Sequence, residues 1–261
     1  MDARYEERAS RLGGAVVWTW TGPRGPARPV LPDGCMDLLL WGGTLVVAGP
    51  DTRAFTPEGA DGNGIGADGT GDASCAGIRF APGTAPALLG VPARELRDRR
   101  VPLDALWPGA RVRRLTERID AAADPVAALE EAALRRAAGA QAPDPLTAAV
   151  AAGLRQGRSV GEVARAVGLG ARQLHRRSLA AFGYGPKTLA RILRLQRALA
   201  LVRAGTAYAD AAYTVGCTDQ AHLAREVREL TGTTLGGYLA GIGHGAEDAR
   251  SGTAQPSGDG R

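Results

Sequence analysis

The stretch from Ser159 to Tyr238 constrains the fold most, because it contains one helical pattern twice. The first copy covers residues 159–189 and the second covers residues 207–239. Corresponding positions, such as Val160 and Tyr208, lie 48 residues apart in the first half of each copy and 49 apart in the second half. We therefore expect one extra residue in the internal turn of the second copy.

Each copy predicts a helix, a short Gly-containing break and a second helix. In the first copy, Ser159 and Glu162 have the spacing of a capping box, which satisfies backbone N–H groups at a helix start. Gly168 can adopt the left-handed conformation that ends this helix. The second helix should start near Ala171, bury Leu174 and expose polar side chains. This order is typical of a helix-turn-helix unit, whose second helix enters the major groove of DNA.

Charge is concentrated in the same part of the chain. The 261 residues carry a formal charge of +5, and residues 143–243 hold thirteen basic and six acidic side chains. That segment is therefore +7 and the rest of the chain is −2. Twelve of the thirteen cations are arginine, which can bond bidentately to phosphate or to guanine. A high-GC genome that prefers arginine codons would also raise this count. A basic segment of this kind suits a polyanion such as double-stranded DNA.

Cysteine spacing and hydropathy indicate the cellular environment that the sequence suits. Cys35, Cys75 and Cys217 are too far apart in sequence to suggest a metal-ligand pair or a disulfide framework. The first twelve residues are charged and lack the apolar core of a signal peptide. No run approaches the ~18 apolar residues of a membrane span. We expect a cytoplasmic protein with reduced thiols and without a membrane segment, a metal or a cofactor.

The N-terminal part predicts a small β-rich domain of sandwich or barrel type in residues 1–108, because short apolar runs alternate with Gly/Pro turns. After a polar lead-in over residues 1–14, strands are expected at 15–20, 36–41, 45–48 and 74–80. From Thr84 the period becomes helical, with helices expected at 84–89, 110–122 and 125–138. Residues 109–142 form a helical connector and linker. The predicted fold class is α+β with an all-α C-terminal domain.

A double helix-turn-helix domain is expected over residues 143–243. A helix over residues 187–204 would join the two units, and its length would be about 27 Å. Such a rod can hold two recognition helices about one turn of DNA apart, ~34 Å. Residues 244–261 have the composition of a disordered tail.

A Gly-rich stretch, residues 56–72, contains two weak motifs. Residues 64–69 form a G-x-G-x-x-G, but the dinucleotide fingerprint requires a strand before it and a helix after it, and both flanks are Pro, Gly and Asp. A calcium loop starting at Asp61 would have Ile65 and Asp72 at its fifth and twelfth positions, where oxygen ligands and a Glu are expected. We interpret the stretch as a hairpin loop.

Residues 145–239 resemble the AraC/XylS family of bacterial transcription regulators. The resemblance rests on Leu-x-Arg at 174–176 and 223–225, on GYGP at 183–186 and on GCTDQ at 216–220. The sequence LPDGCMDLLLW at residues 31–41 resembles an uncharacterised N-terminal domain of one branch of that family. The resemblance implies a sequence-specific DNA-binding regulator rather than an enzyme. Its further partners would be RNA polymerase, an unknown small-molecule effector sensed by the N-terminal domain, and a second copy of the chain.

The resemblance also implies which side chains read DNA. By position, base contacts are expected from Arg172, His175, Arg176, Gln220, His222, Ala224 and Arg225. Arginine can bond guanine, glutamine can bond adenine, and a small alanine can meet a thymine methyl. Phosphate contacts, which position the protein, are expected from Gln173, Arg177, Lys187 and Arg191.

Other interpretations of these residues stay open. Arg176 and Arg225 could be solvated helix arginines. His175 and His222 could cap or pack within the domain. Glu226 could orient Arg225 or contact cytosine.

The chain departs from the family pattern at three core positions. Ser178 and Val227 stand where the family usually has Phe, and Leu235 stands where it usually has Pro. We expect Phe182 to restore part of the lost volume in the first unit. The second recognition helix should therefore be less specific, and the first should dominate affinity.

Two alternatives use Cys35 of the N-terminal domain. As an enzyme, that domain would lack a histidine base, because all three histidines lie outside it, and no nearby residue is evident that would lower the pKa of Cys35. A DNA-repair protein that accepts an alkyl group would need a four-cysteine metal site, and the chain has three cysteines.

Overall fold

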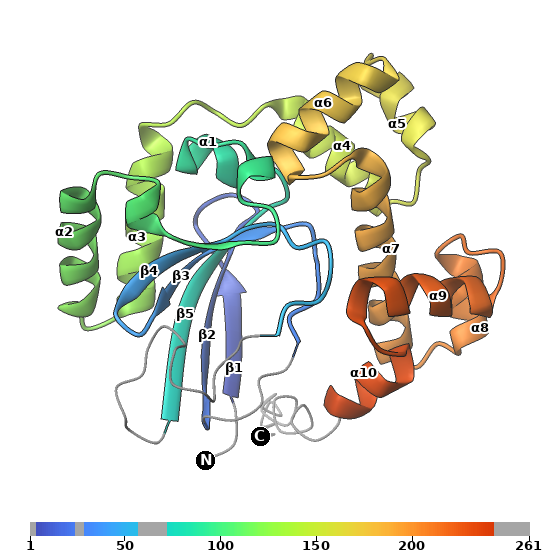
Figure 1. Ribbon diagram of the computed structural model, residues 1–261, viewed down its shortest axis with the longest axis horizontal. Helices are drawn as coiled ribbons and strands as arrows, with labels where there is room; N and C mark the ends of the chain where they lie inside the picture. Colours follow the sequence, from blue (N-terminus) through green and yellow to red (C-terminus); the bar gives the residue numbers. More distant parts are fainter. Residues whose placement is uncertain (1–3, 24–28, 57–71, 243–261) are drawn as a thin grey trace, which may run out of the picture.

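The computed structural model describes residues 4–23, 29–56 and 72–242. In Figure 1 a sheet with its covering helices occupies one side, and a set of helices from the C-terminal half occupies the other. The candidate dinucleotide motif, the candidate calcium motif apart from its last residue Asp72, and the predicted tail at 244–261 lie outside the described residues. Within those described ranges, no helix has both the length and the hydropathy that a membrane span requires.

The N-terminal half forms one antiparallel sheet, which confirms the α+β class. Its strand order is β1-β2-β5-β3-β4-β6. The strands are β1 (Arg4–Ala9), β2 (Val16–Pro23), β3 (Met36–Trp41), β4 (Thr44–Ala48), β5 (Asp72–Phe80) and β6 (Arg100–Pro102). The four runs that predicted strands correspond to β2, β3, β4 and β5. Short apolar runs bounded by Gly/Pro turns made these strands visible in the sequence.

The two edge strands were not predicted. Residues 4–9 are a strand and not a polar lead-in, and all six residues of β1 are exposed. An edge strand that buries neither face carries no alternating pattern, so its sequence does not reveal it. β6 is short and pairs with β4 through Val101 and Val47.

Three helices pack on the sheet: α1 (Ala85–Leu89), α2 (Gly109–Asp120) and α3 (Pro125–Ala138). Their apolar faces join the sheet in one buried cluster, which includes Val17, Ile78, Leu115 and Leu129. The start of α3 follows the prediction, since Asp124 accepts a hydrogen bond from the Ala127 N–H. Two short 3-10 helices, Ala93–Glu95 and Leu103–Ala105, complete this half.

The C-terminal half is all-α, as expected. Its helices are α4 (Pro145–Arg155), α5 (Val160–Ala166), α6 (Ala171–Phe182), α7 (Pro186–Arg203), α8 (Tyr208–Thr214), α9 (Gln220–Thr231) and α10 (Leu235–Ile242). Residues 167–170 separate α5 from α6, whereas residues 215–219 separate α8 from α9. The extra residue in the second turn is therefore confirmed. The capping box at Ser159 and Glu162 is present, and Gly168 has φ +66°.

A second buried cluster fills this helical half, and it receives a residue from the sheet half. Leu31, in the loop before β3, is buried with Leu189, Leu193 and other side chains of the helices. The neighbouring Pro32 carbonyl accepts a hydrogen bond from Gln196 Nε2 on α7 (2.7 Å). The two halves therefore pack directly on each other.

Candidate nucleic-acid interface

The helix predicted to be the first recognition helix, α6, has a buried face and a polar face. Leu174, Ser178 and Phe182 recur at four-residue spacing and are buried, which fixes α6 on the helical core. The opposite face exposes the predicted side chains Arg172, Gln173, His175, Arg176 and Arg177. Phe182 is only 2% exposed and supplies apolar volume one turn beyond Ser178. The predicted residues of this helix therefore lie together on one accessible surface.

Two of these side chains also have partners inside the protein. Arg177 Nη1 donates to Asp144 Oδ2 at 2.5 Å, and Asp144 is the N-cap of α4. The ring of His175 lies against Gly185, where a Cβ would stand 2.8 Å from His175 Cε1. The sequence suggested base or phosphate contacts for both residues, and in the structure both also hold α6 to its neighbours.

The second recognition helix, α9, is built in the same way. Asp219 caps it by accepting the N–H of His222 at 2.6 Å. Leu223, Val227 and Leu230 are buried, while Gln220, Ala224 and Arg225 are exposed. The exposed face includes a shallow hollow of about 430 Å³ lined by Ala224, Arg225, Arg228 and Glu229.

Sequence reasoning did not include Arg228 among the candidates. The spacing in the sequence indicates this residue, because Arg228 follows Arg225 by three positions and residues three apart lie on the same face of a helix. Arg228 is exposed and lines that hollow beside Arg225. We therefore add it to the candidate surface.

Glu226 is turned away from that surface and holds α9 on α7. Its carboxylate is largely buried and accepts hydrogen bonds from Arg191 Nε (3.1 Å) and Arg194 Nη1 (2.9 Å). Arg191 also pairs with Glu229. Glu226 is thus placed neither to orient Arg225 nor to meet cytosine. The charge of Arg191 is matched inside the protein, whereas Lys187, in the first turn of α7, is exposed.

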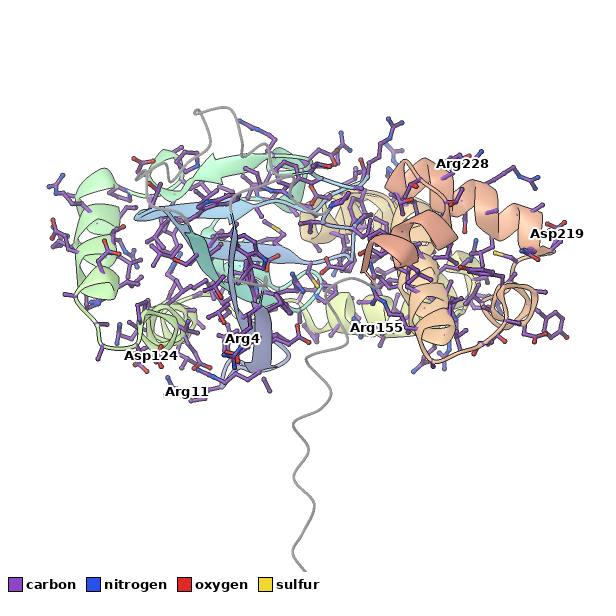
Figure 2. The ribbon with its side chains drawn as sticks, turned by 90° about the horizontal axis from the view of Figure 1, so that it is seen from below. Arg4, Arg11, Asp124, Arg155, Asp219 and Arg228 are labelled. Carbon is purple, nitrogen blue, oxygen red and sulfur yellow. The ribbon has the colours of Figure 1, made fainter. Side chains whose placement is uncertain are left out.

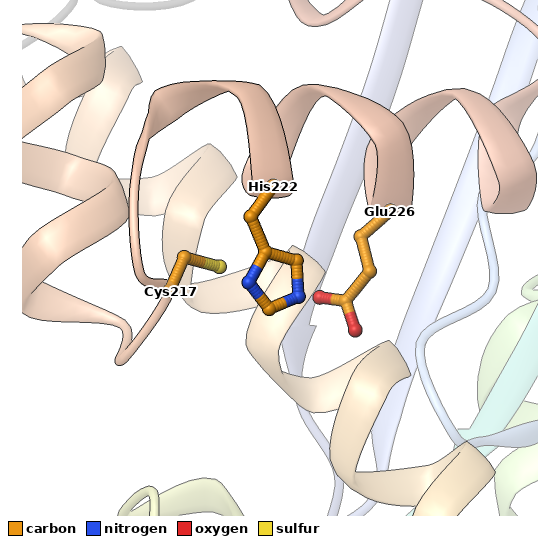
Figure 3. Close-up of side chains that lie close together, drawn as sticks. All are labelled: Cys217, His222 and Glu226. Atoms are coloured by element: carbon orange, nitrogen blue, oxygen red, sulfur yellow. The ribbon is translucent and has the colours of Figure 1, made fainter.

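Cys217, His222 and Glu226 form a compact cluster beside the start of α9 (Figure 3), with candidate ligand atoms within 4.8 Å of one another. The ring of His222 lies between the other two side chains, with one nitrogen toward each. A single imidazole nitrogen therefore does not face both partners. Glu226 is already bonded to two guanidinium groups, which would repel a cation. These residues therefore do not fit a metal ion.

Cys35 in the sheet domain is not an activated nucleophile. Burial, and then the nearby carboxylates of Asp33 and Asp37, raise the pKa of the Cys35 thiol well above its usual value. Burial also raises the pKa of the Cys75 thiol to about 12. Because the thiolate is the reactive form, neither residue is prepared for covalent chemistry. This environment does not favour the two alternatives that used Cys35.

The fold and the exposed faces of α6 and α9 define a class: a two-part protein with a sheet domain and paired helix-turn-helix units. Two family models match the chain, and together they follow these two parts. Residues 163–241 match the family described as "Helix-turn-helix domain", and residues 14–102 match "Domain of unknown function (DUF6597)". The C-terminal part of the chain is therefore similar to a helix-turn-helix family, and the N-terminal part is similar to a family whose function is unknown. No curated protein sequence matches it.

Solved structures to which the chain is similar include ToxT from Vibrio cholerae. The crystal structure from strain O395 is 8% identical, with a TM-score of 0.43, and the alignment covers 86% of this chain and 97% of that one. Wild-type ToxT from strain SCE256, bound to an unsaturated fatty acid, is 10% identical with a TM-score of 0.45, covering 90% and 96%. At this level of similarity, the likeness supports no inference about a ligand or a DNA sequence.

Proposed function

We propose that this DNA-binding regulator reads two successive segments of the major groove, one with α6 and one with α9. The observation that carries the proposal is the matched exposure of arginines on both recognition helices, Arg172 and Arg176 on α6 and Arg225 and Arg228 on α9. In both helices the base-reading candidates lie in the first half, which is the part that reaches base edges in helix-turn-helix proteins. Lys187 supplies an exposed charge for phosphate.

The base contacts are proposed for Arg172, Arg176, Gln220, Ala224 and Arg225. His175 and His222 would act chiefly by shaping the two units, because the His175 ring packs against Gly185 and His222 Nδ1 lies 3.2 Å from Thr218 Oγ1 in the turn before α9. The sheet domain would regulate DNA binding in response to a small molecule or a partner. Its direct packing on the helical half supports this role, since a change in one half must reach the other.

The test is a selection of DNA in vitro with the full-length chain and a library of random 30-base-pair duplexes. The selected duplexes are then footprinted with hydroxyl radicals. We expect two protected segments on one face of the DNA, about one helical turn apart. A single protected segment would contradict reading by two helices, and selection of no duplex would contradict specific DNA binding.

A further inference from the structure

One segment of the sheet domain, Pro50–Phe55, touches the C-terminal ends of both recognition helices. At the end of α6, Gly183 has φ +82°, and a Cβ on it would stand 2.5 Å from Pro50 Cγ. At the end of α9, the Ala54 N–H donates to the Leu230 carbonyl at 2.7 Å. That carbonyl belongs to the last turn of α9, where carbonyl groups have no partner within the helix.

This segment is anchored firmly to the sheet domain. Arg100 on β6 forms a bidentate ion pair with Asp51, at 2.8 and 2.7 Å, and both side chains are mostly shielded from solvent. The guanidinium of Arg100 also lies 3.8 Å from the centre of the Phe55 ring. Thr52 donates through its backbone N–H and its hydroxyl to Asp98.

The contacts lie at the C-terminal ends of the two recognition helices, on the side of the sheet domain. Figure 1 shows the C-terminal ends of α6 and α9 toward the sheet domain. In Figure 2, Asp219, which caps the start of α9, lies at the outer end of the molecule, and Arg228 lies nearer the sheet domain. The proposed base-reading residues are in the outer halves of both helices. The contacts from Pro50 and Ala54 therefore fall at the helix ends opposite to the proposed base-reading residues.

The short length of the segment limits the distance between the two helix ends. Six residues span at most about 20 Å when fully extended. The long helix α7 joins the two helix-turn-helix units through the chain, and Pro50–Phe55 joins them a second time through contacts. Two connections restrict the relative angle of two bodies more than one connection does.

We propose that Pro50–Phe55 is a brace that sets the separation of the two recognition helices and hence the spacing of the two DNA half-sites. This inference rests on the function proposed above. In this account Asp51 and Arg100 are positioning residues, because they act on DNA binding only through the brace. A loosened brace would lower the effective concentration of the second unit at its half-site once the first unit is bound.

The test lengthens or loosens the brace in the full-length chain. One variant inserts two glycines between Arg53, whose side chain is exposed, and Ala54. A second variant is Arg100→Ala. The control is Arg135→Ala, which removes an exposed ion pair on α3. Each protein selects from the random 30-base-pair library, and the spacing between half-sites is counted in the selected duplexes.

We expect the wild type and the control to select one spacing. Both brace variants should select the same two half-sites with spacings that spread by a base pair or more, and they should bind the wild-type duplex about tenfold more weakly. If the brace variants keep the single wild-type spacing, the brace proposal is wrong, even if their affinity falls. If the wild type itself selects no pair of half-sites, the proposed function fails instead, and the two failures are thereby distinguished.

Discussion

Glu130 on α3 anchors the end of the edge strand β1 and the residues that follow it. It is 2% exposed and accepts hydrogen bonds from Arg8 Nη2, Ser10 Oγ and the Arg11 N–H. Burial by itself raises the pKa of this carboxyl, but the hydrogen bonds outweigh burial and lower the pKa to about 2. The folded state therefore favours the ionised form of Glu130.

This pKa predicts a stability change with pH. Because the folded pKa is below the unfolded one, the stabilisation by Glu130 is complete above about pH 4.5 and is lost as the pH falls toward 2. We expect Glu130→Gln to lower the free energy of unfolding by about 2 kcal/mol at pH 7 and by less at pH 3. Urea denaturation at both pH values measures this. An equal loss at both would show that the charge of Glu130 does not matter.

The buried carboxylate of Glu226 predicts a second loss of stability at a single residue. Glu226→Ala would leave Arg191 and Arg194 without their shared partner, at a cost of roughly 3 kcal/mol. The matched control is Glu229→Ala, because Glu229 pairs with the same Arg191 but is 65% exposed. Its loss should stay within about 1 kcal/mol. Urea denaturation of both variants checks this, and equal losses would contradict the role assigned to Glu226.

At the scale of elements, local signals explain which helices and strands were predictable. The capping box at Ser159 and the paired Asp124–Pro125 start each act within a few residues, so the sequence shows them directly. The strands β2 to β5 contain short apolar runs bounded by turn residues, which are visible locally in the sequence. β1 depends on Glu130, more than a hundred residues away, so no local pattern could predict it.

The first turn of α7 carries the charge that should position the protein on DNA without reading its sequence. Lys187 is exposed, whereas Arg191, one turn later, is paired with Glu226 and Glu229. Lys187→Ala should weaken binding to all duplexes alike and lower the slope of log K against log salt by about one. Fluorescence anisotropy titrations at salt concentrations from about 50 to about 200 mM measure this slope. An unchanged slope would remove Lys187 from the interface.

At the scale of the whole molecule, the sequence predicted the two halves but not how they meet. The recognition faces could be placed because helical period alone puts Arg172 and Arg176 opposite Leu174 and Ser178. The contact between Ala54 and Leu230 joins residues 176 positions apart and uses only backbone atoms, which the sequence does not encode locally. The same holds for the carboxylate of Glu226, whose direction depends on the packing of α9 against α7.

The sheet domain contacts both helix-turn-helix units directly. Leu31 is buried among the helices, and Pro50–Phe55 reaches the ends of α6 and α9. Any partner or small molecule that displaced these segments would change the DNA-binding geometry. Regulation by the sheet domain is therefore expected to appear as altered half-site spacing as well as altered affinity.

The central claim, that α6 and α9 both read DNA, is tested most directly by two substitutions on one selected duplex. Arg176→Ala and Arg225→Ala should each weaken specific binding by ~1–3 kcal/mol and relax preference at one base pair, with the larger effect for Arg176. Binding to unrelated duplexes should change little. If both variants bind the selected duplex with wild-type affinity and preference, these helices do not read the sequence.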